Sequence, residues 1–457
     1  MTKRYDAVII GFGKGGKTLA GYLAGQGKQV AVIEKSSEMY GGTCINVGCI
    51  PTKSLVHSAE QAKTRKLESF EQKAVFYKEA IAQKRKLVGM LRGKNYHMLA
   101  DQEAICIYRG VGSFLNAHEV QIQGEDGETV IFGEQIFINT GSQAVVPSIA
   151  GIEGSSRVYG SESLMEMDRL PAELVIIGGG YIGLEFASMY HMFGSKVTVL
   201  QNMPNFIPRE DKDISNAVHA ELARQGIEFV FSADIDRIED QEEKTLVHYR
   251  VGNREYQKTA DAVLVAAGRR PNTKELQLAP AGVETLPNGG IKTDSQRRTT
   301  AQNIWAMGDV AGGLQFTYVS LDDFRIVKAA LAGGSYVDEG RNIPYSVFLD
   351  PPLSRVGLTE REAREQHYEI AVAVLPTAAI PKAHVLQDTA GFLKAIVDKK
   401  TKKILGAALF CAESYEMINI VKVAMDAGLP YTVLRDQIFT HPTMSESLND
   451  LFGRVQL

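Results

Sequence analysis

The sequence from Gly41 to Lys53 reads GGTCINVGCIPTK, and it sets two cysteines, Cys44 and Cys49, five positions apart. Pro51 suits the first turn of a helix, so a helix is expected to begin beside the second cysteine. A helix N-terminus carries free amide groups and partial positive charge, which favour thiolate over thiol, and Lys53 adds a positive charge. The stretch therefore predicts a nucleophilic sulfur with a second cysteine near enough to resolve the product of its attack.

Other readings of the cysteine pair are a structural disulfide, two buried free thiols or a metal site. Four cysteines in 457 residues, with no expected signal peptide, favour a reducing, cytoplasmic environment over a structural disulfide. A zinc site needs two more ligands nearby, and only His57 offers itself. From the pair alone, redox chemistry is favoured, and two buried free thiols and a metal site stay open. For the whole chain, no resident metal is predicted.

Composition excludes several classes of partner. The chain has 50 Lys and Arg against 54 Asp and Glu, a formal net charge of -4, with no long block of one sign. This balance does not favour nucleic acid or an acidic membrane surface as a partner. Hydrophobic residues make up 44% of the chain without an apolar run of spanning length. We expect a globular protein of about three domains.

A first dinucleotide-binding motif follows the apolar strand expected at 7–10. Its glycines are Gly11, Gly13 and Gly16, and a helical run, a second strand and Glu34 come next. Strand, glycine turn, helix, strand and terminal acid together form the dinucleotide fingerprint. The glycines let the backbone approach a pyrophosphate, and Glu34 accepts hydrogen bonds from a ribose diol.

A second motif of the same kind begins with the strand expected from Leu174. Its glycines are Gly178, Gly180 and Gly183, and Gln201 follows Gly178 by 23 residues, as Glu34 follows Gly11. The repeat predicts two dinucleotide folds in series. An acid at position 201 favours NAD and an arginine cluster after it favours NADP, but Gln201 is neutral and the nearest basic residue is Arg209. The choice of nicotinamide coenzyme therefore stays open.

Five motifs in order resemble the flavoprotein disulfide reductases, the family of glutathione reductase, dihydrolipoamide dehydrogenase and mercuric reductase. They are GGTCINVGCIPTK, the second glycine motif running into Gly183-Leu-Glu185, AAGRRPN at 266–272, WAMGDV at 305–310 and HPTMSE at 441–446. The resemblance covers essentially the whole chain. It implies an α/β protein with two Rossmann-like domains and a C-terminal α+β dimerisation domain, like glutathione reductase. The domains are then expected at 1–147 (FAD), 148–270 (NAD(P)), 271–341 (return to the FAD domain) and 342–457 (interface).

The resemblance also assigns residues to the two cofactors. FAD is expected to be held by Gly11, Gly13, Gly16, Glu34, Lys35, Gly42, Thr43, Thr140, Gly141, Ser142 and Asp309. NADH or NADPH is expected to be held by Gly178, Gly180, Tyr181, Ile182, Gly183, Gln201, Gly268 and Arg269.

Catalytic roles follow from the same resemblance. Lys53 and Glu185 match an ion pair beside the flavin atom that receives hydride. Cys49 matches the sulfur next to the flavin, and Cys44 matches the interchange thiol that meets the substrate. His441, held by Glu446, matches an acid-base pair that serves the cysteines of the partner subunit, so a homodimer is expected.

The residues expected around the substrate resemble one group of proteins within this family. GGLQFTYVSLDDFR follows Val310-Ala311 and is expected to bring Phe316, Thr317 and Tyr318 near the active site. This stretch resembles the RclA-type reactive-chlorine-resistance flavoproteins, which include hypothiocyanous acid reductases. The resemblance implies reduction of hypothiocyanous acid or related oxidants. The alternatives are a dihydrolipoamide dehydrogenase or glutathione-type reductase, a Cu(II) or Hg(II) reductase, and a non-enzymatic redox-sensing flavoprotein.

Two further expectations concern the remaining chain. The lysine-rich, helical stretch at 58–99 is expected to form surface helices with its basic residues in solvent. Cys106 and Cys411 lie in apolar strands and are expected to be buried, inert thiols.

Overall fold

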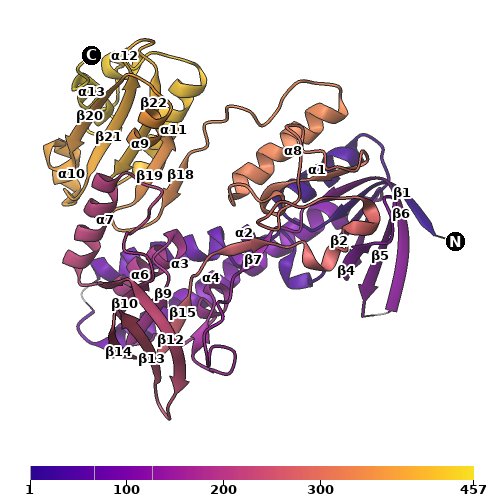
Figure 1. Ribbon diagram of the computed structural model, residues 1–457, viewed down its shortest axis with the longest axis horizontal. Helices are drawn as coiled ribbons and strands as arrows, with labels where there is room; N and C mark the ends of the chain where they lie inside the picture. The colour runs from indigo at the N-terminus through magenta and orange to yellow at the C-terminus, as the bar shows by residue number, and fades with distance from the viewer. Residues whose placement is uncertain (1, 66, 126) are drawn as a thin grey trace.

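A computed structural model describes residues 2–65, 67–125 and 127–457. The first sheet has the strand order β3-β2-β1-β6-β5-β4, and β17 also pairs with β6, so a late strand returns to the first unit (Figure 1). β1 runs parallel to both β2 and β6, and its last four residues are buried on both faces. The elements are β1 (Lys3–Ile10), α1 (Lys14–Gly25), β2 (Val30–Glu34), β3 (Ile105–Arg109), β4 (Val111–Phe114), β5 (Glu119–Gly124), β6 (Gly127–Ile138) and β17 (Ile304–Ala306).

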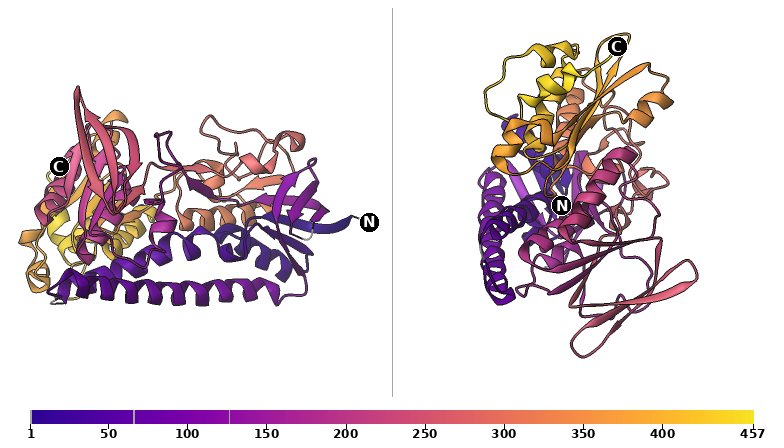
Figure 2. Two further views of the ribbon diagram at one scale, coloured as in Figure 1. Left: turned by 90° about the horizontal axis from the view of Figure 1, so that it is seen from below. Right: turned by 90° about the vertical axis from the view of Figure 1, so that its left-hand side faces the viewer.

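The segment between β2 and β3 carries the cysteines. It contains η1 (Ser37–Met39), α2 (Thr43–Asn46), α3 (Cys49–Thr64) and the long α4 (Phe70–Ala100), which runs beside α3 (Figure 2). α3 begins at Cys49 with Pro51 in its first turn, which confirms the helix predicted there. The prediction of solvated basic residues is wrong at Lys84, which is 1% exposed and paired with Glu166. A buried ammonium needs such a partner.

The second unit contains its own parallel sheet of order β11-β10-β9-β15-β8 and an antiparallel meander β12-β13-β14. α6 packs against α3, so the second glycine loop is brought up to the cysteine segment. The elements are β7 (Ser142–Ala144), β8 (Val158–Tyr159), α5 (Ser161–Leu164), β9 (Glu173–Ile177), α6 (Tyr181–Phe193), β10 (Lys196–Gln201), α7 (Lys212–Gln225), β11 (Glu228–Phe231), β12 (Ala233–Asp240), β13 (Thr245–Val251), β14 (Arg254–Ala260), β15 (Ala262–Val265) and β16 (Arg269–Pro271).

The chain then returns to the first unit, where α8 packs against α1. It continues into a C-terminal antiparallel sheet of order β18-β19-β22-β21-β20, covered by α11, α12 and α13 (Figure 1). The elements are η2 (Lys274–Leu276), η3 (Ala279–Ala281), η4 (Gly308–Ala311), α8 (Thr317–Leu331), β18 (Tyr345–Val347), β19 (Leu353–Gly357), α9 (Glu360–Glu365), β20 (Ile370–Pro376), η5 (Thr377–Ala379), α10 (Pro381–Leu386), β21 (Phe392–Asp398), β22 (Ile404–Phe410), α11 (Ser414–Asp426), α12 (Thr432–Asp436) and α13 (Ser447–Gly453).

A buried cation joins the second unit to the C-terminal unit. Lys394 is 2% exposed, and its Nζ lies 3.1 Å from Asp211, 2.8 Å from Asp213 and 2.9 Å from Glu360. Because removing one partner of a buried ion pair is costly, this cluster is a contact that the two units need to keep.

The other two cysteines lie apart from the pair. Cys411 is fully buried, as predicted, and burial raises the pKa of its thiol. Cys106 on β3 is only half-buried, so its predicted burial is wrong in part. Within the described ranges, no helix is both long and apolar enough to cross a membrane.

Candidate active site

A cavity of about 1720 Å³ runs through the region where the units meet. The predicted residues that line it are Gly11, Gly13, Glu34, Lys35, Gly42, Thr43, Cys44, Cys49, Lys53, Thr140, Gly141, Ser142, Tyr181, Ile182, Glu185, Arg269, Asp309, Phe316, Thr317 and Tyr318. Ligand pockets commonly measure about 300–1,000 Å³, so this cavity has room for a dinucleotide and a small substrate.

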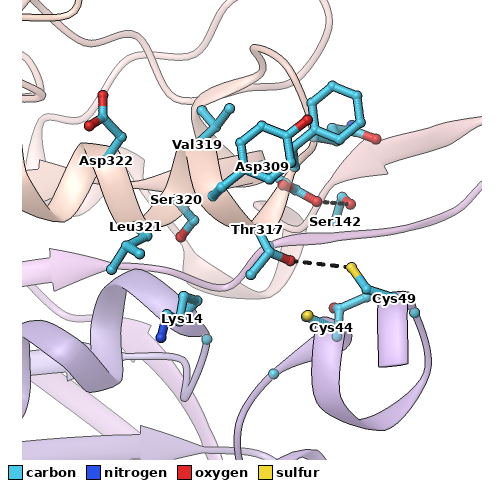
Figure 3. A pocket seen from close by; sticks show the side chains of 18 of the residues that line it. Lys14, Cys44, Cys49, Ser142, Asp309, Thr317, Val319, Ser320, Leu321 and Asp322 are labelled. Atoms are coloured by element: carbon cyan, nitrogen blue, oxygen red, sulfur yellow. Dashed lines mark hydrogen bonds between the residues drawn. The ribbon is translucent and has the colours of Figure 1, made fainter. Parts of the chain in front are cut away.

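Two helix N-termini face each other at the cysteines. Cys44 lies on the short α2, Cys49 is the first residue of α3, and Thr317 is the first residue of α8. Figure 3 shows the hydroxyl of Thr317 directed at the sulfur of Cys49, with Oγ1 and Sγ 3.5 Å apart. Both helix ends direct partial positive charge at this sulfur.

The two thiols differ in acidity. The pKa of Cys49 is lowered to about 6, first because the Cys44 thiol donates a hydrogen bond to it, with Thr317 and the charge of Lys53 adding to the effect. The pKa of Cys44 is raised, first by that same hydrogen bond and then by burial. At neutral pH the pair therefore holds its first thiolate on Cys49, whereas Cys44 keeps its proton until a base removes it.

An ion pair between Lys53 on α3 and Glu185 on α6 lines the cavity. Lys53 Nζ lies 2.7 and 2.8 Å from the two carboxylate oxygens of Glu185, and the backbone N–H of Phe348 donates to Glu185 Oε1 at 2.9 Å. The ammonium also lies 4.5 Å from the centre of the Phe348 ring. The Lys53 and Glu185 side chains are 31% and 11% exposed, so solvent screens the attraction between their charges less than it does for a pair on the surface.

The first glycine loop is closed by two side chains. Glu34 Oε2 accepts a hydrogen bond from the N–H of Phe12 at 3.0 Å, and burial raises the pKa of this carboxyl. Asn139 Oδ1 accepts from the N–H of Gly16 at 2.9 Å, and its Nδ2 donates to the carbonyl of Met307. Sequence analysis missed Asn139, although its place at the carboxyl end of β6 was a usable signal.

Glycine is required at two positions around this loop because neighbouring backbone atoms leave no room for a Cβ. A Cβ on Gly11, whose φ is +105°, lies 2.3 Å from the carbonyl oxygen of Asn139. A Cβ on Gly42, whose φ is +76°, lies 2.7 Å from Cα of Gly13. The bare backbone on both sides, with the Glu34 carboxylate at the end of β2, fits an FAD pyrophosphate and adenosine ribose.

Ser142 lines the cavity and forms hydrogen bonds with both Asp309 and Arg269. Its hydroxyl donates to Asp309 Oδ2 at 2.7 Å (Figure 3), and burial raises the pKa of Asp309. Arg269 donates to Ser142 Oγ at 3.0 Å and to its carbonyl at 2.7 Å. Arg269 was predicted to bind the nicotinamide coenzyme, but in the structure it contacts Ser142, a residue predicted to bind FAD. Lys35 forms an exposed ion pair with Glu275 at 3.3 Å.

The second glycine loop repeats the geometry of the first. Gln201 Oε1 accepts a hydrogen bond from the N–H of Gly179 at 2.9 Å, as Glu34 does from Phe12. A Cβ on Gly178 lies 2.5 Å from the Ala266 carbonyl oxygen, and one on Gly183 lies 2.0 Å from that of Gly178. Gly180 caps α6, whose first two residues are Tyr181 and Ile182. Gly268 lies nearby, where its carbonyl accepts from Val145. The loop is shaped for a second pyrophosphate.

An aromatic stack flanks Thr317. The ring of Phe316 lies 5.2 Å from that of Tyr318 and 5.9 Å from that of Tyr345, with planes 9° and 12° apart. The hydroxyl of Tyr318 donates to the carbonyl of Pro344 at 2.5 Å. The predicted proximity of this stretch to the cysteines is confirmed by the contact of Thr317 with Cys49.

The histidine of the C-terminal motif is placed elsewhere. Glu446 holds His441 through contacts of 2.8 and 3.1 Å to Nδ1, and the histidine side chain is 71% exposed. Among the described residues that line the cavity, neither His441 nor Glu446 is present. The pair therefore faces outward from its own chain.

These features define a disulfide reductase with two nucleotide sites, and comparison with known proteins establishes the family. Residues 5–323 match the model of the pyridine nucleotide-disulphide oxidoreductases, and residues 343–452 match the dimerisation domain of that family. The chain belongs to this family, the flavoprotein disulfide reductases, with a glutathione-reductase-like fold. The predicted family, fold and enzyme class are confirmed.

Individual relatives were found over the full length of the chain. It is 52% identical to the probable pyridine nucleotide-disulfide oxidoreductase RclA of Escherichia coli, covering 99% of this chain and 100% of that protein. A Cu(II) complex of a mutant of the HOCl-induced flavoprotein disulfide reductase RclA from Escherichia coli superposes with a TM-score of 0.93 at 52% identity, covering 100% of both chains. A mercuric reductase of Lysinibacillus sphaericus is 33% identical over 97% of this chain and 81% of that protein.

Proposed function

We propose that this enzyme reduces hypothiocyanous acid, or a related small oxidant at sulfur, with electrons from NADH or NADPH. The observation that supports this most is the thiolate environment of Cys49 beside Thr317, next to a stack of three aromatic rings. The reactive cysteine pair therefore shares one cavity with these aromatic rings, and its sulfurs are accessible to a small electrophile. The similarity to a reductase named as HOCl-induced agrees with a role in oxidant defence.

The first step is attack by Cys44 on the oxidant. Its thiol has a raised pKa, so a base must take the proton before the thiolate attacks the sulfur of hypothiocyanous acid. An S–S bond forms, the S–O bond breaks, and hydroxide leaves and is protonated to water. The product is a thiocyanate group bound to the sulfur of Cys44.

The second step is resolution by Cys49. Its thiolate, already present at neutral pH, attacks the sulfur of Cys44 and releases thiocyanate. The two cysteines end as a disulfide, and two electrons have passed to the oxidant. A resolving thiolate kept ionised beside the attacking sulfur limits over-oxidation of Cys44.

Return of the disulfide to two thiols needs an electron pair from the coenzyme. FAD would be held along the first glycine loop by Glu34, Ser142 and Asp309, and when bound it would pass that pair from the nicotinamide to the disulfide. The second glycine loop with Gln201 and Tyr181 would hold the coenzyme, and the Lys53–Glu185 ion pair would serve the hydride transfer. The Thr317 hydroxyl and the two helix ends stabilise the thiolate that forms on Cys49.

The base is proposed to come from a second subunit. His441 is exposed and held by Glu446, whereas the cysteine pair has no such base among the residues described around it. In a twofold dimer, His441 of the partner subunit takes the proton from Cys44 and returns it to the leaving oxygen.

We further propose that the four segments expected at 1–147, 148–270, 271–341 and 342–457 are the domains, and that the enzyme acts in the cytoplasm.

The proposal is tested by comparing substrates side by side. Purified protein is supplied with NADH or NADPH and with hypothiocyanous acid, oxidised glutathione or lipoamide, and coenzyme oxidation is followed. We expect kcat/KM for hypothiocyanous acid to exceed those for the two disulfides by about 100-fold or more, which equals about 2.7 kcal/mol of transition-state discrimination. Preference for lipoamide or glutathione refutes the proposal and assigns a disulfide as the substrate.

Metal-ion reduction is a second candidate because a solved relative is a Cu(II) complex and another relative is a mercuric reductase. Within the described residues, no group of three or more His, Cys, Asp or Glu is arranged to hold a metal ion. In this candidate function, Cys44 and Cys49 therefore bind the metal ion that is reduced. Anaerobic coenzyme oxidation driven by Cu(II) or Hg(II), and its loss in Cys44→Ser, supports this candidate. Equal rates in the wild type and Cys44→Ser contradict a thiol route.

A further inference from the structure

The buried carboxylate of Glu210 links Tyr181 and Tyr345, two neighbouring tyrosines that line the cavity. Glu210 is 3% exposed, and its Oε1 accepts hydrogen bonds from the hydroxyl of Tyr181 at 2.6 Å and from the hydroxyl of Tyr345. Tyr181 begins α6 directly after the second glycine loop, and Tyr345 begins β18 in the C-terminal unit. One oxygen therefore ties the wall of the predicted coenzyme site to a residue of another unit.

Tyr345 continues this connection to the thiols. Its ring stacks on Phe316, which stacks on Tyr318. Thr317 lies between these two residues in sequence, and its hydroxyl contacts the sulfur of Cys49. The contacts that start at Tyr181 therefore end next to the group that stabilises the thiolate.

The charges around Glu210 favour this arrangement. The Arg355 guanidinium lies 3.6 Å from Glu210 Oε2 and is 9% exposed, whereas Oε2 has no hydrogen-bond partner in the described part of the chain. The pKa values of both tyrosines are raised, first by burial and then by the charge of Glu210, so both remain protonated donors. Glu210 thus holds two phenols through one oxygen and relies on Arg355 for the other.

We propose that Glu210 and Tyr345 are positioning residues that couple occupancy of the coenzyme site to access at the cysteine pair. The inference rests on the proposed function, because it takes the second glycine loop to hold the coenzyme. A nicotinamide moving from that loop to the Lys53–Glu185 pair passes Tyr181, which lines the cavity. Its displacement breaks the hydrogen bond from Tyr181 to Glu210 and the direct contact of Tyr181 with Tyr345, whose hydroxyls lie 3.2 Å apart and whose ring centres lie 5.5 Å apart. Tyr345 loses this support, and its stack on Phe316 loosens. Bound coenzyme therefore opens the thiol side of the cavity.

The test measures thiol access directly. Holoenzyme reduced with dithiothreitol is labelled anaerobically with N-ethylmaleimide, and mass spectrometry follows the peptide that holds Cys44. Labelling is repeated with 1,4,5,6-tetrahydro-NAD or tetrahydro-NADP, which bind like reduced coenzymes but donate no hydride. We expect the wild type to label about tenfold faster with one of them, the scale of a hydrogen bond to a charged acceptor.

Tyr345→Phe removes the hydroxyl that Glu210 holds and keeps the ring. We expect this variant to label fast without nucleotide and to change by less than about twofold when nucleotide is added. Glu210→Gln keeps the shape of the side chain and is expected to behave in the same direction. Tyr77→Phe is the matched control, because it removes a buried tyrosine–tyrosine hydrogen bond of 2.9 Å outside the cavity and should keep the wild-type response.

Two results overturn the coupling. In the first, Tyr345→Phe and Glu210→Gln fold, as judged by flavin content and unfolding temperature, yet respond to nucleotide like the wild type. In the second, neither NADH nor NADPH reduces the flavin of the wild type, which refutes the proposed function and the coupling with it. Normal flavin reduction with labelling independent of Tyr345 refutes the coupling alone.

Discussion

Replacing Thr317 by valine removes the hydroxyl 3.5 Å from the Cys49 sulfur while keeping the shape of the side chain. A hydrogen bond to a charged acceptor contributes about 1.5 kcal/mol, which corresponds to roughly one pKa unit. The pKa of Cys49 should therefore rise from about 6 to about 7. At pH 7 the thiolate fraction then falls from roughly 90% to about one half.

The assay is a pH titration of the reduced protein, read by ultraviolet absorbance of the thiolate. Because the two cysteines titrate together, the first of two midpoints is compared between wild type and Thr317→Val. Turnover depends on the deprotonated form, so the rate falls as the pH drops through this midpoint. The acid limb of the pH–rate profile should therefore shift to higher pH in Thr317→Val by the same amount as the midpoint. Thr377→Val is the matched control, because it removes a buried hydroxyl 3.5 Å from the Phe410 carbonyl in the C-terminal unit. A midpoint in Thr317→Val that equals that of the wild type refutes the assigned role of the hydroxyl.

Three further outcomes are expected. Mixed dimers of Cys44→Ser and His441→Gln subunits should regain roughly half of the wild-type turnover, because one of their two sites is intact if the histidine acts across the interface; inactive mixed dimers place the histidine in its own chain. Gly42→Ala should lower flavin content and unfolding temperature, since its φ of +76° costs about 1–2 kcal/mol and its Cβ meets the first glycine loop at 2.7 Å; unchanged flavin content contradicts this. Glu185→Gln leaves Lys53 without its carboxylate partner, so flavin reduction by coenzyme, followed by stopped-flow absorbance, should slow by about tenfold. An unchanged rate would show that the ion pair does not contribute to hydride transfer.

Features set by neighbouring residues were predictable from the sequence. The helix that begins at Cys49 follows from Pro51, and the two glycine turns follow from their spacing to Glu34 and Gln201. In each case the responsible atoms lie within one strand–turn–helix unit. The backbone geometry of such a unit depends little on the rest of the molecule.

Features set by distant segments were not predictable in the same way. Glu210, Tyr181 and Tyr345 come from three separate parts of the chain and carry no local signal of their meeting. The buried Lys84 looked like one more surface lysine, because its neighbour Glu166 is 82 residues away. Which sulfur ionises first also depends on tertiary structure.

That last point divides the roles of the two cysteines. In the proposed mechanism Cys44 is still the thiol that attacks the oxidant, and the hydrogen bond that it donates favours the thiolate on Cys49, with Thr317 and Lys53 adding to this effect. The sequence shows both cysteines but not the hydrogen bond between their thiols.

The hydrogen bond from Gly179 uses only the carbonyl oxygen of the Gln201 amide, just as the first loop uses only one oxygen of Glu34 for Phe12. Under the proposed function, the amino group of Gln201 is left to meet the adenosine ribose of the coenzyme. Glutamate at position 201 offers the loop the same kind of acceptor, so Gln201→Glu adds a charge at the proposed coenzyme site and leaves the closing hydrogen bond in place.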